Sequence, residues 1–203
     1  MNKKELIYFL THNNILKTKS IIQAFKKIDR KDFIPTKYAD EAYNDYPLSI
    51  GFNQTISQPS TVALMLEILS PKKGDRILDV GSGSGWTTAL LGYIVGIRGR
   101  VCGVELIPDL VLFGRYNLEK YNLENTRIYQ ATQHLGLKEK GPFDKILVSA
   151  TAKEIPQELV DQLKVGGSMV IPVKNSIFKV YKKSEDRIEK KEIPGFVFVP
   201  LIY

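Results

Sequence analysis

The sequence predicts a doubly wound, Rossmann-like α/β fold with a mostly parallel sheet and an N-terminal helical segment. Three observations support this fold. Short β-branched runs alternate with helical patterns from Arg76 onward, which is typical of βαβ units with right-handed crossovers. A glycine-rich turn at 81–85 follows the first of these runs, where open α/β sheets commonly bind ligands. The length of 203 residues suits one domain.

The first 70 residues carry helical rather than strand spacing. Between residues 1 and 45, apolar residues recur every three or four positions, which predicts two or three short helices. A polar, Asn-rich break at 11–14 separates the first helix from the next. Pro47 opens a segment that we expect to run as a loop to Pro59, and the spacing over 61–69 predicts another helix.

Five β-branched runs predict the strands of the sheet, at Ile77–Val80, Val101–Leu106, Arg127–Tyr129, Lys145–Val148 and Met169–Val173. Helical patterns lie between them, at Trp86–Val95, Leu110–Tyr121 and Ile155–Leu163. We expect the last helix to stop at Gly166-Gly167, because glycine is a common helix terminator. Two late runs, Phe178–Lys182 and Phe196–Ile202, predict further strands, with an antiparallel hairpin at the sheet edge as one arrangement.

Composition places the chain among ordinary globular proteins. Apolar residues make up 43% and charged residues 25% of the sequence. No run approaches the roughly 20 apolar residues of a membrane helix, and the amino terminus lacks the pattern of a signal peptide. We therefore expect a cytoplasmic, monomeric protein without a membrane partner. Residues 1–203 are predicted to form one domain, in which 1–70 precede the sheet-forming part at 71–203.

The net charge of +7 raises the possibility of a nucleic-acid partner, because clustered cations neutralise phosphates. The densest basic segment, Lys179–Lys191, also contains Glu185, Asp186 and Glu189. Mixed signs favour a solvated edge or hairpin over a phosphate-binding stripe. A nucleic-acid partner is therefore not expected.

Cysteine and histidine are scarce. The single cysteine, Cys102, lies in a predicted strand, where packing is a more common role than catalysis. The two histidines, His12 and His134, are too few to predict a metal cluster. We expect no metal site and no disulfide within the chain.

The turn at 79–85 reads D-V-G-S-G-S-G and differs from the dinucleotide pattern G-x-G-x-x-G. Its third glycine comes one residue early, and Trp86 stands where the pattern needs glycine. Asp79 would repel a pyrophosphate, whereas S-adenosylmethionine has no phosphate and carries a sulfonium and an ammonium. Glu105, twenty positions after Gly85, is placed to accept hydrogen bonds from both ribose hydroxyls. The turn favours adenosylmethionine, with a tight turn that binds nothing as the alternative.

One family resemblance begins at 50–59, which reads I-G-F-N-Q-T-I-S-Q-P. This segment resembles the substrate loop of protein-L-isoaspartate O-methyltransferases, and T-I-S-x-P is its most specific part. Further segments resemble that family in the same order along the chain, at 30–35, 42–48, 77–85, 148–152, 155–156, 162–167, 171–173 and 198–201. The resemblance covers nearly the whole chain and implies a Rossmann-like fold of the class I methyltransferase type.

The resemblance implies an enzyme that moves a methyl group from S-adenosylmethionine to the free α-carboxyl of L-isoaspartyl residues in damaged proteins or peptides, a repair activity. Ser57 matches the family's active-site serine. The implied cofactor-binding residues are Gln54, Thr55, Ile56, Ser57, Asp79, Gly81, Gly83, Gly85 and Glu105. We expect Ala150, Thr151 and Ala152 to border the peptide substrate together with Ser57, with simple packing as the alternative for the three strand-end residues.

The segment after the third sheet strand departs from the family pattern. Where the family usually has an Asp-Gly pair near the adenine, this chain has Thr132-Gln133. Either the Thr132 hydroxyl or the Gln133 amide replaces the side-chain acceptor for the adenine amino group, or that acceptor is missing. We predict weaker or differently shaped adenosine binding, and we interpret His134 as a polar loop residue rather than a base.

The implied reaction is compatible with this small set of groups. A carboxylate with a pKa of about 3.9 is ionised at neutral pH, so methyl transfer to it needs no general base. Ser57 is expected to orient that carboxylate by donating a hydrogen bond, whereas an ordinary turn serine is the alternative.

Two other functions remain open. The same scaffold could methylate RNA or another peptide carboxylate, as the charge and Thr132-Gln133 suggest, or the chain could be a degenerate module that binds adenosylmethionine, or only a protein partner, without turnover. Asp79 and Trp86 disfavour a hydride-transfer enzyme.

Overall fold

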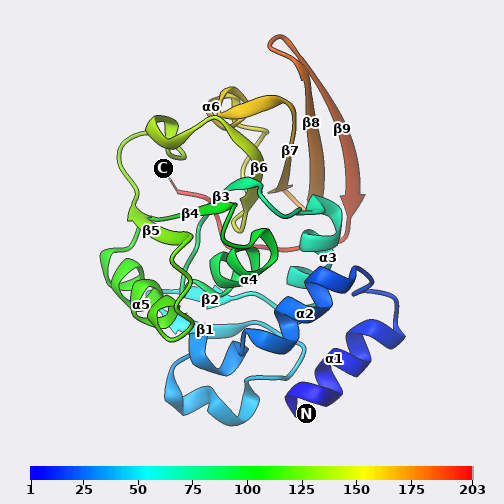
Figure 1. The fold of residues 1–203 in the computed structure, drawn as a ribbon, viewed down its shortest axis with the longest axis vertical. Coiled ribbons are helices and arrows are strands. Elements are labelled where there is room, and N and C mark those ends of the chain that lie inside the picture. Colours follow the sequence, from blue (N-terminus) through cyan, green and yellow to red (C-terminus); the bar gives the residue numbers. More distant parts are fainter. Residues whose placement is uncertain (203) are drawn as a thin grey trace.

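The computed structural model describes residues 1–202, which form a seven-stranded sheet with helices on both faces (Figure 1). The strand order is β5-β4-β3-β6-β7-β8-β9; β3 to β7 pair in parallel, while β8 and β9 are antiparallel. The strands are β3 (Arg76–Val80), β4 (Arg100–Glu105), β5 (Thr126–Gln130), β6 (Phe143–Val148), β7 (Leu163–Val173), β8 (Ser176–Ser184) and β9 (Arg187–Pro194). The doubly wound, mostly parallel sheet is confirmed.

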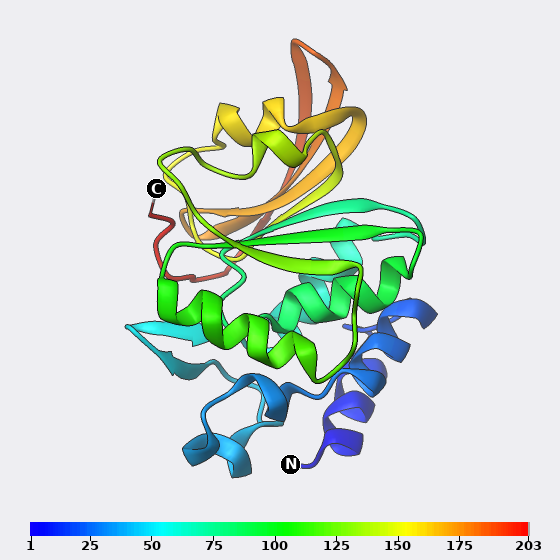
Figure 2. The same cartoon turned by 60° about the vertical axis from the view of Figure 1, so that its left-hand side comes forward.

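The two faces of the sheet are covered unequally. The helices α3 (Pro59–Leu69), α4 (Trp86–Val95) and α5 (Pro108–Glu119) contribute to the larger core cluster, together with the N-terminal helices. The short helix α6 (Gln157–Asp161) and the loop around η3 (Lys138–Lys140) lie over the opposite face. Figure 2 shows α4 and α5 stacked below the sheet and α6 above it. Because alternate residues of each buried strand point to opposite faces, both faces have an apolar layer.

The N-terminal part begins with the predicted short helices. These are α1 (Lys3–His12), α2 (Lys19–Lys27) and two 3-10 turns, η1 (Arg30–Phe33) and η2 (Thr36–Glu41). The loop predicted from Pro47 to Pro59 is wrong in part, because β1 (Leu48–Gly51) and β2 (Gln54–Ile56) form an antiparallel hairpin. The buried side chains of Leu48, Ile50 and Ile56 account for this hairpin, since they anchor it to the main core.

The helix predicted at Ile155–Leu163 is shorter than expected, since α6 ends at Asp161 and Leu163 already belongs to β7. Gly166-Gly167 therefore does not stop a helix but lies within β7. Gly166 has a φ of +83°, and a Cβ on Gly167 would lie 2.8 Å from the Lys164 carbonyl oxygen. Positive φ and close backbone approach are the properties of glycine at an irregular strand pairing, and the register between β6 and β7 shifts here.

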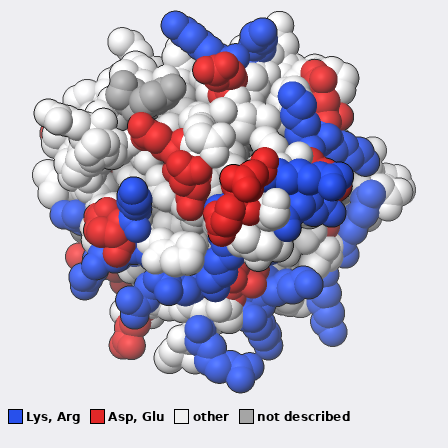
Figure 3. Space-filling model, turned by 90° about the horizontal axis from the view of Figure 1, so that it is seen from above, with Lys and Arg blue, Asp and Glu red and all other residues white. Residues whose placement is uncertain are grey.

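The predicted final strand at Phe196–Ile202 is also wrong. The edge hairpin consists of β8 and β9, and the mixed-charge segment Lys179–Lys191 lies within it, as the charge pattern predicted. After Pro194 the chain leaves the sheet, and its last described residues make one isolated bridge, from Pro200 to Thr151. Seen from above, acidic side chains lie among the basic ones (Figure 3).

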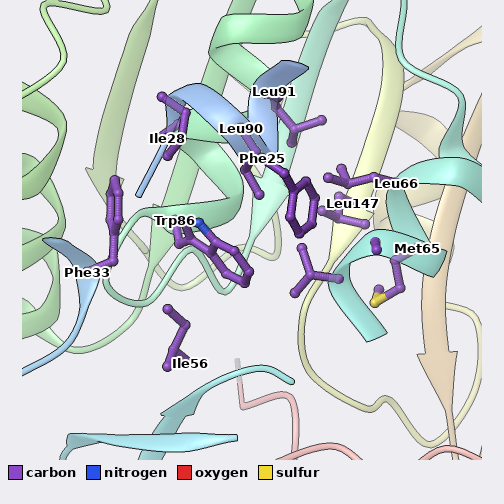
Figure 4. Close-up of a cluster of buried hydrophobic side chains, with 14 of the residues drawn as sticks. Phe25, Ile28, Phe33, Ile56, Met65, Leu66, Trp86, Leu90, Leu91 and Leu147 are labelled. Atoms are coloured by element: carbon purple, nitrogen blue, oxygen red, sulfur yellow. The ribbon is translucent and has the colours of Figure 1, made fainter. Parts of the chain in front are cut away.

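Trp86, the first residue of α4, packs in the core. Its side chain is 3% exposed and meets the Phe25 ring edge-on, with ring centroids 5.6 Å apart. In Figure 4 it lies between Phe25 of α2 and Ile56 of β2. Cys102 is buried in β4, where burial raises the pKa of its thiol, in agreement with a packing role. This core joins the hairpin β1–β2 to the helix that follows the glycine turn.

Candidate active site

A cavity of about 410 Å³ opens at the carboxyl ends of the parallel strands. The strand order reverses beside β3, because β4 and β6 flank it on opposite sides, and ligands bind open α/β sheets at such a point. The cavity walls come from the hairpin β1–β2, the turns after β3, β4, β5 and β6, and the segment 199–202. Its volume lies within the roughly 300–1,000 Å³ typical of small-molecule sites.

The glycine turn after β3 forms one side of this cavity. Gly81 and Gly83 line it, and both have positive φ, at +76° and +51°. A Cβ on Gly83 would lie 3.2 Å from Ile50 Cδ1 in the hairpin. Gly85 does not line the cavity but faces α5, where a Cβ would lie 3.1 Å from the Gly114 carbonyl oxygen. Gly85 thus allows the glycine turn to pack closely against α5 and does not itself contact the cavity.

Glu105, at the end of β4, lies in the cavity wall with 7% of its surface exposed. Its Oε2 accepts a hydrogen bond from the Gly83 backbone N–H at 2.8 Å, and Oε1 accepts one from the Ile107 N–H at 3.0 Å. These two bonds fix the carboxylate in one orientation. Each oxygen retains a further lone pair, so the predicted pairing with two ribose hydroxyls is compatible with this geometry.

Asp79 lies behind the wall rather than in it, with no exposed surface and no place among the lining residues. Its Oδ2 accepts hydrogen bonds from the hydroxyls of Thr87 and Thr88 at 2.7 and 2.6 Å. Burial raises the pKa of Asp79 to about 6, although these two hydrogen bonds act in the opposite direction. The structure therefore places Asp79 beneath the glycine turn, where it fixes the start of α4.

The hairpin β1–β2 and the turn after it supply the opposite wall. Gln54, Thr55, Ile56 and Ser57, for which the family resemblance implied cofactor binding, all line the cavity. Ser57 is half-buried, and its backbone carbonyl accepts a hydrogen bond from Arg30 Nη2 at 3.2 Å. The serine that the sequence singled out is thus held in place through its own backbone.

Arg30 is an anchor that the sequence analysis did not identify. Its guanidinium is 2% exposed and donates to the carbonyls of Ala42 and Tyr46 at 2.7 and 2.9 Å, besides Ser57. It also lies 5.6 Å from the centre of the Trp86 ring. Burial lowers the pKa of Arg30 to about 10 despite the favourable charge of a nearby aspartate. Arg30 stands among the charged residues Asp29, Lys31 and Asp32, so its residue type gave no sign of burial, and the segment 30–35 was singled out only for its family resemblance.

A second anchor holds the same turn from the side of α3. Asp45 accepts hydrogen bonds from the Gln58 side chain at 3.1 Å and from the Ser60 backbone N–H at 2.8 Å. Together, Arg30 and Asp45 hold the Ser57 carbonyl and the residues that follow it. The region that the sequence marked as a substrate loop is therefore bound to the core at several points.

The turn after β5 contributes Thr132, His134, Leu135 and Gly136 to the cavity, whereas Gln133 does not line it. Thr132 is exposed, and its hydroxyl oxygen accepts a bond from the His134 N–H at 3.4 Å. The turn is held from α6 and the residue after it. Glu158 accepts from the Leu135 N–H at 2.9 Å, and Gln162 both accepts from and donates to this segment. Of the pair Thr132-Gln133, which departs from the family pattern, Thr132 is the residue placed to contact a ligand.

The last described segment closes one end of the cavity. Val199, Pro200, Leu201 and Ile202 line it, a role that the sequence analysis missed because it expected a strand. Thr151 donates its backbone N–H to the Val199 carbonyl and accepts from the Leu201 N–H, both at 2.8 Å. Ala150 lines the cavity with Ser149, but Thr151 and Ala152 do not. Of the three strand-end residues, Ala150 therefore lines the cavity, Thr151 pairs with the segment 199–202, and Ala152 pairs with the end of β7.

Within 1–202, no group of three or more His, Cys, Asp and Glu side chains could hold a metal ion. No described helix is both long and apolar enough to cross a membrane.

Comparison with known proteins supplies the remaining observation. The sequence model of the family described as protein-L-isoaspartate(D-aspartate) O-methyltransferase (PCMT) matches residues 1–203. The chain belongs to this family. A protein-L-isoaspartate O-methyltransferase from Fervidobacterium nodosum is 41% identical over 187 residues, which are 91% of this chain and 94% of that protein. One from Pyrococcus horikoshii is 40% identical over 204 residues, 98% of this chain and 92% of the relative.

A solved structure agrees with the family assignment. A Plasmodium falciparum protein, described as a protein-L-isoaspartate O-methyltransferase in complex with S-adenosyl-L-homocysteine, matches with a TM-score of 0.88 and 29% identity. The match covers 100% of this chain and 99% of that one. The class I methyltransferase fold and the use of S-adenosylmethionine thus agree with the sequence prediction.

The cavity has features that fit this cofactor. A fixed carboxylate, Glu105, stands beside a turn whose glycines have no side chain to fill the space. The Ser82 hydroxyl and the Trp86 indole nitrogen, both at the cavity, are buried without a hydrogen-bond partner among the described residues. Within the described part of the chain no lysine or arginine side chain lines the cavity, as suits a ligand with a sulfonium and an ammonium rather than phosphates.

Proposed function

We propose that this chain transfers a methyl group from S-adenosylmethionine to the free α-carboxyl of L-isoaspartyl residues in damaged proteins or peptides. The observation that carries the proposal is one cavity with two unlike walls. One wall holds the glycine turn and Glu105, and the other holds the T-I-S turn around Ser57. Family membership over residues 1–203 supports the same activity.

The cofactor is assigned to the sheet side of the cavity. The Glu105 carboxylate accepts hydrogen bonds from the ribose hydroxyls. Gly81 and Gly83 leave room for the ligand, and Thr132 lies at the adenine end of the cavity. When bound there, S-adenosylmethionine supplies an electrophilic methyl group. Asp79 supports this wall from behind through Thr87 and Thr88, without itself reaching the cavity.

The acceptor carboxylate is assigned to the side of Ser57. The Ser57 hydroxyl orients it with a hydrogen bond, while Arg30 holds the serine through its carbonyl. No side chain needs to remove a proton, because the α-carboxyl is already ionised at neutral pH. Orientation alone supplies several kcal/mol towards the transition state, so a fixed turn is what this chemistry requires.

A labelled-methyl transfer assay tests the proposal. Two peptides of the same sequence, one with an isoaspartyl and one with a normal aspartyl residue, are compared with methyl-labelled adenosylmethionine. We expect base-labile label only on the isoaspartyl peptide. Equal labelling of both would contradict the substrate assignment, and no labelling of either, despite measurable cofactor binding, would favour a non-catalytic module.

The alternative of an RNA acceptor has a specific motivation in the charge of +7 and in Thr132-Gln133. On the face shown in Figure 3, acidic residues lie among the basic ones, which argues against a continuous phosphate-binding surface there. RNA binding that persists at moderate salt, with methyl transfer to RNA, would support this alternative instead.

A further inference from the structure

An exposed aromatic residue occupies the tip of the hairpin β1–β2. Phe52 and Asn53 form the two-residue turn, with φ values of +55° and +56°. Both central residues of the most common hairpin turn need positive φ, and asparagine and glycine adopt it readily. Phenylalanine does not, because its Cβ crowds the backbone at a cost of about 1–2 kcal/mol. Phe52 therefore makes this turn less stable than asparagine or glycine would at the same position.

The Phe52 side chain does not recover that cost by packing. It is 55% exposed, whereas Ile50 and Ile56 of the same hairpin are buried in the core. Phe52 nevertheless lines the cavity, close in sequence to Ser57 and on the same wall. A strained conformation at the edge of a binding site is a reasonable sign of function.

Two further exposed apolar side chains lie at the same cavity. Leu106, after β4, is 40% exposed, and Ile202, in the last described segment, is 65% exposed. The three residues come from three separate parts of the chain, and Figure 2 shows the hairpin turn, the start of α5 and the C-terminal segment on one side of the molecule. Solvent-exposed apolar side chains that gather around a cavity mark an interaction site.

We propose that Phe52, with Leu106 and Ile202, forms an apolar rim that selects peptides with an apolar side chain next to the isoaspartyl residue. This proposal rests on the proposed function, because it concerns the same acceptor site. When the free α-carboxyl of the isoaspartyl residue reaches Ser57, the peptide segments before and after that residue must both pass over the mouth of the cavity. The side chain beside the methylated residue then meets the rim, where burial of apolar surface favours leucine or phenylalanine over serine or aspartate.

The test uses two series of isoaspartyl peptides, in which the residue immediately before or immediately after the isoaspartate is Leu, Ser or Asp. For the wild type we expect kcat/KM to be about tenfold higher for Leu than for Ser in at least one series, through a lower KM. Phe52→Asn keeps a residue that tolerates positive φ. It should reduce this ratio to about twofold and leave the protein equally or more stable.

Leu112→Asn is the matched control. Leu112 is an apolar residue of α5 with 64% exposure, and it does not line the cavity. It should leave the Leu-to-Ser ratio unchanged.

A ratio that is the same in wild type and Phe52→Asn, in both series, would overturn the rim proposal. Wild-type methylation of the Ser peptide would leave the proposed function standing in that case. Failure to methylate any isoaspartyl peptide would instead reject the function itself.

Discussion

The two walls of the cavity are built differently. The sheet wall, with the glycine turn and Glu105, continues directly from β3 and β4, whose strands are paired on both sides in the centre of the sheet. The covering wall consists of the hairpin β1–β2 and the segment 199–202, which hold their positions through a few anchors such as Arg30 and Thr151. The chain thus places the cofactor side in the centre of the seven-stranded sheet and the acceptor side on segments outside that sheet.

This difference has a consequence for mutations. Substitutions in the sheet wall should change cofactor binding and stability together, because the same groups serve both. Substitutions in the covering wall should change turnover or peptide preference with little effect on stability. Four measurements test that separation, from the largest expected effect to the smallest.

Glu105→Ala should have the largest effect. It removes the acceptor for two backbone N–H groups and for the ribose hydroxyls, and hydrogen bonds to a charged group are worth about 1.5–3 kcal/mol each. We expect adenosylmethionine affinity to fall about 100-fold, by calorimetric titration, with a lower midpoint of urea unfolding. Glu105→Gln, which keeps one acceptor oxygen, should lose less of both. Loss of affinity without loss of stability would contradict the coupling.

Asp79 predicts a pH dependence of stability. Its pKa is raised from 3.8 to about 6 in the folded protein, so the native state holds the proton more tightly than the unfolded state. This contributes stability that is present below pH 3.8 and is lost as the pH rises through about 6, on the order of 3 kcal/mol. Urea unfolding of wild type and Asp79→Asn between pH 4 and 7 isolates this contribution. Parallel curves for the two proteins would reject it.

Gly85→Ala should destabilise the sheet wall without touching the cavity. The added Cβ would lie 3.1 Å from the Gly114 carbonyl oxygen, at a φ of +90°. Gly74→Ala is the control, because Gly74 has a φ of +88° and nothing within 4 Å of the added Cβ. We expect thermal or urea unfolding to show about 2 kcal/mol more destabilisation for Gly85→Ala. Equal losses would mean that strain alone, and not packing against α5, determines the cost.

Ser57→Ala should have the smallest effect on stability and a selective effect on turnover. Removal of one orienting hydrogen bond should lower kcat on an isoaspartyl peptide at least about tenfold, about 1.4 kcal/mol. Cofactor affinity should change less than twofold, and the unfolding midpoint should not change. Ser49→Ala serves as the control, since Ser49 lies in the same hairpin but does not line the cavity. An equal loss of cofactor affinity would place Ser57 on the cofactor side instead.

Local patterns were enough to predict the sheet, most helix positions and the glycine turn. Hydrophobic periodicity and turn residues report each element's own burial, and β3 to β6 and α4 lie close to their predicted places. The same patterns failed where tertiary contacts decide. Gly166-Gly167 signals a helix stop in isolation, but it accommodates close backbone approach between β6 and β7.

The sequence by itself determined the fold class, the choice of adenosylmethionine over a dinucleotide, and Glu105 and Ser57 as residues of one site. Only the tertiary structure separated Gly81 and Gly83, which line the cavity, from Gly85 and Asp79, which support it from behind. It alone revealed the Arg30 anchor and the contribution of 199–202. The physical reason is that residue types and spacing encode backbone conformation and burial, whereas the direction of a side chain depends on contacts between segments far apart in the chain.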